Sequence, residues 1–255
     1  MNKAYSIHYG LRTVDKLKYK KDIPPVVMAD QDARTMAEIA SAEQFEPIAI
    51  RIDEEATRRA FLQDFETVCS ILKPGDFFMF TFAGHGTQVP DTSGDEAKYG
   101  DKKALDEGFC FHDGVILDDK IAELLAGLPE DTFFIAVIDC CYSGDLYKFI
   151  EETASQQSEH VKELVDSFKF TGVWLSAVRE NEKAKGDENG GIFTQNIKKL
   201  WKEGRFEGNY VELYNQVEEI SPSVNTPRCK PLGVRGWQFM EGCVPFHHDA
   251  SCIDE

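Results

Sequence analysis

The sequence has no hydrophobic run long enough to cross a membrane, and it has few basic residues relative to its acidic ones. A transmembrane helix needs roughly 20 consecutive apolar residues, and no run among these 255 residues approaches that length. Lys and Arg together number 28 against 45 Asp and Glu, for a formal net charge of −17. This charge repels phosphate backbones and anionic lipids, so we expect no nucleic-acid or membrane partner. Basic protein substrates are electrostatically favoured.

Features of secreted and zinc-binding proteins are also missing. The first residues form a short apolar patch that soon turns polar, unlike the apolar core of a signal peptide. The cysteines are odd in number and include no C-x-x-C pair, which argues against a disulfide framework and a structural zinc site. They are Cys69, Cys110, Cys140, Cys141, Cys229, Cys243 and Cys252. We therefore expect reduced thiols in a cytoplasmic protein.

Short apolar segments alternate with longer amphipathic segments along the first 180 residues. The apolar segments predict strands, and apolar residues spaced three and four positions apart predict helices. The predicted strands cover residues 5–11, 45–52, 77–83, 132–138 and 172–177, and the predicted helices cover residues 32–42, 54–72 and 118–128. This alternation predicts an α/β fold with a mostly parallel central sheet between layers of helices.

Two polar segments interrupt the alternation. Residues 88–106 are rich in Asp, Gly and Lys and are too long for a plain connection, so they are either functional or mobile. Residues 181–191 form a second polar, glycine-containing loop. Helix-like segments at 193–202 and 210–220 and a proline-containing tail follow it. We expect a single domain over residues 1–255, with the polar loop separating a larger part (1–178) from a smaller part (192–255).

Two predicted strands each end at a residue suited to nucleophilic catalysis. The strand at 77–83 leads into Gly84-His85-Gly86, and the strand at 132–138 leads into Asp139-Cys140-Cys141. Because the carboxyl ends of parallel strands meet at one edge of a sheet, an imidazole and a thiol are delivered to the same place. A lone His there is usually a polar cap and a lone Cys a small buried residue. The pair favours a Cys–His dyad, in which His moves the proton between thiol and leaving amine.

These two blocks resemble the metacaspase and orthocaspase branch of the caspase-like cysteine peptidases. Phe82-Ala83-Gly84-His85-Gly86-Thr87-Gln88 corresponds to S-G-H-G-[ST]-Q, and Asp139-Cys140-Cys141-Tyr142-Ser143-Gly144 corresponds to D-x-C-H-S-G. The resemblance extends from residue 5 to residue 177 and is sharpest between residues 77 and 144. Ala83 and Tyr142 depart from the usual Ser and His beside the dyad, which implies altered specificity with the catalytic pair intact.

The resemblance implies a caspase–hemoglobinase fold, in which residues 1–178 are large-subunit-like and residues 192–255 are small-subunit-like. It implies a monomeric endopeptidase with Cys141, rather than Cys140, as the nucleophile and His85 as its partner. The oxyanion hole would consist of the backbone N–H groups of Gly86 and Cys141. The chemistry itself requires no cofactor, and no third, orienting side chain can be assigned.

The same resemblance implies cleavage after Arg or Lys. The carboxylates expected to bind the basic side chain map onto Asp139, two residues before the nucleophile, and onto Asp32, in Gln31-Asp32-Ala33. Carboxylates bind a guanidinium strongly and with defined geometry when the site is partly dry. Asp32 has an alternative role as the cap or first-turn acid of the helix that follows it. Asp139 has an alternative role as a buried carboxylate that caps a loop.

Calcium is implied as a candidate activator. The corresponding carboxylates are Asp106, Asp118 and Asp119, and oxygen ligands in a flexible loop suit Ca²⁺. A further carboxylate found in some relatives falls on Lys148 here, so the set is incomplete, although Asp145 lies nearby. The alternative role for Asp118 and Asp119 is to stabilise the start of the predicted helix at 118–128 through its dipole.

Other functions remain open at this point. One is a catalytically silent caspase-like scaffold that binds partners through the same sheet edge, and another is a peptidase with non-basic specificity. A cysteine phosphatase is disfavoured because Tyr147 stands where its phosphate-binding loop needs Arg, and a dinucleotide-binding module lacks its G-x-G-x-x-G. Basic residues at 179–185 make self-cleavage in that loop a further hypothesis.

Overall fold

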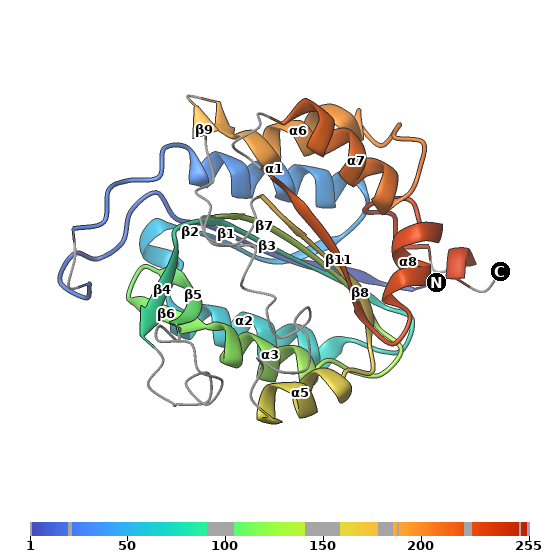
Figure 1. Ribbon diagram of the computed structural model, residues 1–255, viewed down its shortest axis with the longest axis horizontal. Helices are drawn as coiled ribbons and strands as arrows, with labels where there is room; N and C mark the ends of the chain where they lie inside the picture. Colours follow the sequence, from blue (N-terminus) through green and yellow to red (C-terminus); the bar gives the residue numbers. More distant parts are fainter. Residues whose placement is uncertain are drawn as a thin grey trace.

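The computed structural model describes residues 2–19, 22–90, 105–140, 159–177, 186–187, 189–221, 226–249 and 251–253. A six-stranded sheet in the order β11-β8-β7-β3-β1-β2 forms its centre (Figure 1). The strands are β1 (Ala4–Gly10), β2 (Glu46–Ile52), β3 (Phe77–Gly84), β7 (Phe133–Cys140), β8 (Thr171–Ser176) and β11 (Arg228–Gly233). All neighbouring pairs are parallel except β11 with β8. The predicted α/β fold with a mostly parallel sheet is confirmed.

Helices cover both faces of this sheet (Figure 1). One face carries α1 (Ala29–Ala42), α6 (Ile192–Trp201), α7 (Tyr210–Ile220) and α8 (Gly236–Gly242). The other face carries α2 (Arg58–Ile71), α3 (Asp118–Ala126) and α5 (Glu159–Asp166). Short 3-10 helices occur at η1 (Asp53–Glu55) and η3 (Ser251–Ile253). Within the described ranges, none of the helices combines the length and the apolar character that a membrane crossing requires.

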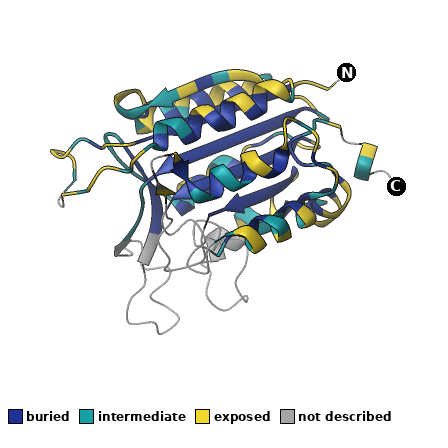
Figure 2. Cartoon of the chain, turned by 90° about the horizontal axis from the view of Figure 1, so that it is seen from above, coloured by how far each residue is buried: buried dark blue, intermediate teal, exposed yellow. Residues whose placement is uncertain are grey.

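The central strands are mostly apolar because helices cover them on both sides. Every residue of β3 and of β7 is buried. In β3, Phe78 and Phe80 belong to the core beneath α2 and α3, whereas Phe77 and Met79 belong to the core beneath α1 and α8. Figure 2 shows the result, with buried strands between helices whose outer faces are exposed. The two cores fix the ends of β3 and β7, where the candidate site lies.

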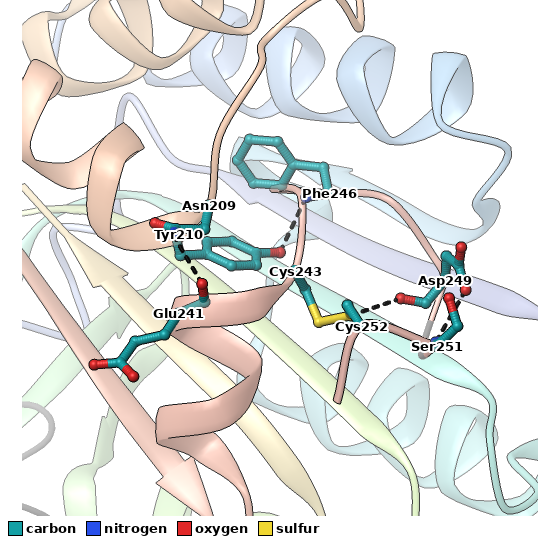
Figure 3. Close-up of a disulfide and its surroundings, with 8 residues drawn as sticks. All are labelled: Asn209, Tyr210, Glu241, Cys243, Phe246, Asp249, Ser251 and Cys252. Atoms are coloured by element: carbon teal, nitrogen blue, oxygen red, sulfur yellow. Dashed lines mark hydrogen bonds between the residues drawn. A yellow bond between two sulfur atoms is a disulfide. The ribbon is translucent and has the colours of Figure 1, made fainter. Parts of the chain in front are cut away.

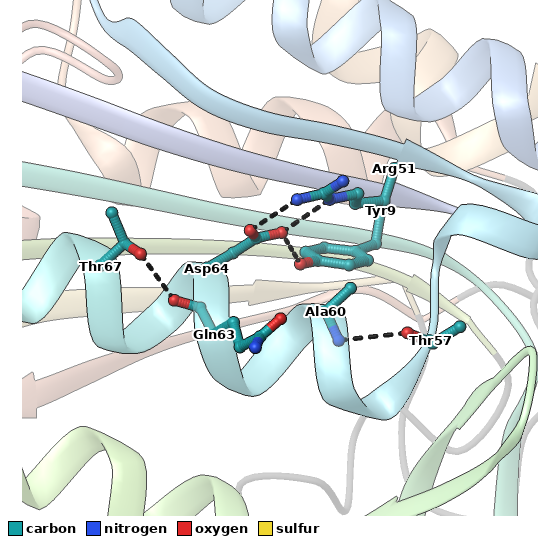
Figure 4. A network of polar contacts seen from close by, with 7 residues as sticks. All are labelled: Tyr9, Arg51, Thr57, Ala60, Gln63, Asp64 and Thr67. Carbon is teal, nitrogen blue, oxygen red and sulfur yellow. Dashed lines mark hydrogen bonds and ion pairs between the residues drawn. The ribbon is translucent and has the colours of Figure 1, made fainter.

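A polar network joins the first two strands to α2 (Figure 4). The Tyr9 hydroxyl donates to Asp64 Oδ2 at 2.6 Å, and the Arg51 guanidinium donates to both oxygens of the same carboxylate at 2.9 and 2.8 Å. Tyr9 and Asp64 are buried, and burial is the largest cause of the raised pKa of the Tyr9 hydroxyl. The carboxylate is thereby paired and hydrogen-bonded, as a buried charge must be.

Strands occur in three segments that the sequence did not predict as strands. A small antiparallel sheet is made of β4 (Gly86–Pro90), β5 (Leu105–Phe111) and β6 (Gly114–Leu117), partly within the predicted loop at 88–106. The polar loop contains the two-residue strands β9 (Gly186–Asp187) and β10 (Gly190–Gly191). The tail supplies β11, which tolerates Pro231 because it is an edge strand.

The expectation of reduced thiols is wrong for two cysteines. Cys243, at the end of α8, is joined to Cys252 in η3 by a disulfide (Figure 3). The segment between them is held further by the Tyr210 hydroxyl, which accepts a hydrogen bond from the Phe246 amide at 3.0 Å. Cys69, Cys110, Cys140 and Cys229 are not part of a disulfide. The odd count and irregular spacing concealed a pair that the fold of the tail brings together.

Candidate active site

The two strands predicted to carry the dyad end side by side. β3 and β7 are neighbours in register, and Gly84 is paired with Cys140. His85 directly follows the first of these residues and Cys141 directly follows the second. Cys141 lies outside the described residues, so the prediction that it is the nucleophile stays a prediction. Cys140 is buried in the core beneath α2 and α3, as expected for a cysteine that is not the nucleophile.

His85 lies in the turn where the chain leaves the large sheet for the small one, and its side chain is partly exposed. The Nε2 atom is 2.6 Å from the carbonyl oxygen of Pro24. A carbonyl oxygen only accepts hydrogen bonds, so Nε2 must be the protonated nitrogen, and Nδ1 is then the basic nitrogen of the neutral ring. The orienting group missing from the sequence analysis is thus a backbone carbonyl. No residue type signals it, because every residue has one.

Asp139 is buried near the end of β7, on the sheet face covered by α1 and α6. Its register neighbours are Ala83 of β3 and, beyond it, Gly10 of β1. The carboxylate oxygen Oδ2 accepts two hydrogen bonds from Thr194, one from the amide at 3.1 Å and one from the hydroxyl at 2.8 Å. Burial raises the pKa of Asp139, and the two bonds from Thr194 act in the opposite direction.

Asp32 lies in the first turn of α1 and is buried. Both of its carboxylate oxygens accept from the Gly191 amide, at 3.0 and 2.9 Å. The N-cap residue of α1 is Met28, which makes no side-chain capping bond, so Asp32 is a first-turn acid and not the N-cap. The structure therefore brings Asp32 and Asp139, which are 107 residues apart (139 − 32), to the start of α6.

Each of the two carboxylates lies close to the backbone of one of two consecutive glycines. A Cβ atom at Gly190 would lie 2.3 Å from Asp32 Oδ1, and one at Gly191 would lie 2.1 Å from Asp139 Oδ2. Gly190 also has a φ of +125°, a backbone conformation that residues other than glycine rarely adopt. Beside this contact, Asp32 and Thr194 line a cavity of about 380 Å³ between α1 and α6, together with Thr35, Gln195 and Lys198.

The expected oxyanion donors and calcium ligands are only partly described. Gly86 begins β4 directly after His85, whereas the Cys141 amide lies outside the described residues. Asp106 pairs with Val89 through the backbone, and its side chain is not described.

Asp118 and Asp119 begin α3, and Asp118 Oδ1 accepts from the Asp119 amide at 3.1 Å. Among the described side chains, no group of three or more His, Cys, Asp or Glu residues could hold a metal ion. Because the side chain of Asp106 is not among those described, calcium binding stays a prediction.

Comparisons with known proteins identify related sequences. A family model described as metacaspase, peptidase C14 domain, matches residues 20–149. Metacaspase-2 of Trypanosoma brucei brucei is 41% identical over 75 residues, which are 29% of this chain and 21% of that protein. Metacaspase-7 of Arabidopsis thaliana is 30% identical over 139 residues, which are 51% of this chain and 33% of that protein. These matches span a fifth to a third of the relatives' lengths.

The fold has a close match among solved structures. The crystal structure of a protein from Geobacter sulfurreducens superposes on this chain with a TM-score of 0.80. The superposition covers 96% of this chain and 98% of the other. The two sequences are 24% identical, so this likeness concerns the fold alone.

Proposed function

Because the chain belongs to the metacaspase family of C14 peptidases, we propose that it is a cysteine endopeptidase that cleaves peptide bonds after Arg or Lys. The observation that carries the proposal is the register of β3 and β7, whose paired residues Gly84 and Cys140 directly precede His85 and Cys141. Two buried carboxylates near the same sheet edge supply negative charge for a basic side chain.

In the proposed reaction, His85 acts through Nδ1 while its Nε2–H stays bonded to the Pro24 carbonyl. The imidazole takes the proton of the Cys141 thiol, and the thiolate attacks the carbonyl carbon of the scissile bond. The backbone N–H groups of Gly86 and Cys141 stabilise the oxyanion that forms. The intermediate then expels the amine, which receives the proton from His85. Water hydrolyses the resulting thioester and regenerates the thiol.

Specificity for basic residues is assigned to Asp32 and Asp139. Both side chains are buried, so a guanidinium or ammonium group would meet them with little competing water. Arg is favoured over Lys where two carboxylate oxygens can accept in one plane. The overall charge of −17 attracts basic substrates toward the protein before they reach the pocket.

Calcium activation through Asp106, Asp118 and Asp119 is proposed on their residue types and on the family resemblance. Two of the three begin α3 and the third lies in β5, which is connected to it through β6. Hard carboxylate oxygens are the ligands that Ca²⁺ requires.

A panel of fluorogenic peptides with Arg, Lys or Asp before the scissile bond tests the proposal. We expect cleavage after Arg and Lys, no cleavage after Asp, and loss of all cleavage in Cys141→Ala. Cys140→Ala is the matched control and should retain activity, because that thiol is part of the core. Running the panel with calcium and with chelator tests the activator.

The other outcomes have definite meanings. Cleavage after Asp alone would establish a peptidase of non-basic specificity and overturn the role of the two carboxylates. No cleavage of any peptide by folded protein, with or without calcium, would favour the catalytically silent scaffold.

A further inference from the structure

The first turn of α6 holds one oxygen of Asp139. Thr194 donates both its amide and its hydroxyl to Oδ2, at 3.1 and 2.8 Å, and the contact spans 55 positions of sequence. Within the described residues, the other oxygen, Oδ1, makes no hydrogen bond. The carboxylate is therefore fixed in one orientation by a residue outside the strand that carries it, and one oxygen is left to accept from a ligand.

We propose that Thr194 is a positioning residue for basic specificity, whose hydroxyl keeps Asp139 oriented and ionised so that Oδ1 pairs with the substrate's guanidinium or ammonium group. This inference rests on the proposed cleavage after Arg or Lys. The local chemistry supports it, because a carboxylate buried among apolar residues is stable as an anion only when donors satisfy it. Thr194 supplies two such donors, and a neutral acid could not pair with a cation.

Few other charges act on Asp139 from the elements packed around it. On α1, Asp32 is itself bonded to the Gly191 amide. On β1, Gly10 is in register with Asp139 through Ala83 of β3. His8 lies two residues before Gly10 on β1 and therefore points to the same face of the sheet as Asp139. Burial lowers the pKa of His8 to about 3, so this ring is neutral at physiological pH. On α6, Lys198 lines the neighbouring cavity and pairs with Glu38 at 3.2 Å.

As a consequence, Thr194 determines how low the pH can fall before basic ligands bind weakly. Burial raises the pKa of Asp139, and the bonds from Thr194 lower it. Removing the hydroxyl removes part of the opposing effect, so the carboxyl group stays protonated up to a higher pH. Basic ligands should then bind weakly at mildly acidic pH and recover as the pH rises. A residue that only capped α6 would change stability without moving this midpoint.

The test measures binding of benzamidine, a small guanidinium-like cation, to full-length protein carrying Cys141→Ala, by calorimetry between pH 4.5 and 8. Thr194→Val removes the hydroxyl at nearly constant volume, Thr194→Ala removes it with less crowding, and Thr194→Ser keeps it. Thr171→Val is the matched control, because Thr171 is also buried but its hydroxyl makes no hydrogen bond within the described residues. The carboxyl carbon of Asp139 is titrated by NMR in the same proteins.

We expect benzamidine binding to weaken at least about tenfold at pH 6 in Thr194→Val and Thr194→Ala, as for loss of a hydrogen bond to a charged group. The binding midpoint and the Asp139 titration should both move to higher pH, while Thr194→Ser and Thr171→Val stay within about twofold of the parent. An unmoved Asp139 titration in a folded Thr194→Val or Thr194→Ala protein would overturn the positioning role. If the parent binds no benzamidine, the basic specificity is wrong, and the NMR titration still decides whether Thr194 holds Asp139 ionised.

Discussion

Replacing Asp139 with Asn should make the protein more stable and less active at neutral pH. Asn is nearly the same size, and its carbonyl oxygen can accept both hydrogen bonds from Thr194. The substitution therefore keeps the packing and removes one buried negative charge. Where a charge is held for function and not for stability, its removal commonly has these two opposite effects.

The effect on stability depends on pH with a definite sign. Burial raises the pKa of Asp139 in the folded protein above its unfolded value of about 3.9. The folded state then binds more protons than the unfolded state, so parent stability falls as the pH rises from about 4 through the folded pKa. Asp139→Asn lacks this loss. The difference in free energy of unfolding should be small near pH 4, grow with pH, and then level off.

The effect on activity follows from the loss of one partner of a buried charge pair. Such a loss costs about 2–5 kcal/mol, which is roughly 30-fold to 4,000-fold in kcat/KM for an Arg peptide. Urea unfolding at several pH values and steady-state kinetics measure the two effects. If Asp139→Asn lowers stability equally at every pH and leaves Arg cleavage unchanged, Asp139 is only a cap for α6 and the specificity argument is wrong.

Two further predictions concern stability away from the site. Reducing the Cys243–Cys252 disulfide, which closes a loop with a sequence separation of 9, should lower the free energy of unfolding by about 2–3 kcal/mol; an unchanged urea midpoint after full reduction would show that the bridge does not stabilise the tail. Tyr9→Phe should cost about 1.5–3 kcal/mol because it removes a donor to the Asp64 carboxylate. Tyr5→Phe is its control, since the Tyr5 hydroxyl makes no hydrogen bond within the described residues, and equal losses in the two variants would contradict this account.

The sheet could be predicted because its signal is local and strong. β3 and β7 are nearly continuous apolar runs, and helices cover both of their faces. Once they are placed in one parallel sheet, the position of His85 follows from the chain direction alone. The predicted start of α1 at residue 32 is three residues later than the observed start at Ala29, because the N-cap residue, Met28, has no capping side chain to signal it.

The features that the sequence did not predict depend on contacts that no local sequence pattern indicates. The strands β4 and β5 pair across a long polar stretch that has no strand pattern of its own. Thr194 reaches Asp139 only after α6 has packed beside α1, and no spacing in the sequence indicates that bond. The Cys243–Cys252 pair forms because the tail folds back on α8, although the composition favoured free thiols.

Labelling with a peptidyl-arginyl chloromethyl ketone, followed by mass spectrometry of the digested protein, tests the central claim most directly. Such a reagent needs an acidic pocket that binds its arginyl side chain and an activated thiol beside that pocket. We predict one adduct per chain, located on Cys141, with labelling strongly slowed in His85→Ala. An adduct on another cysteine, or no adduct on folded protein in the presence and absence of calcium, would contradict the Cys141–His85 dyad.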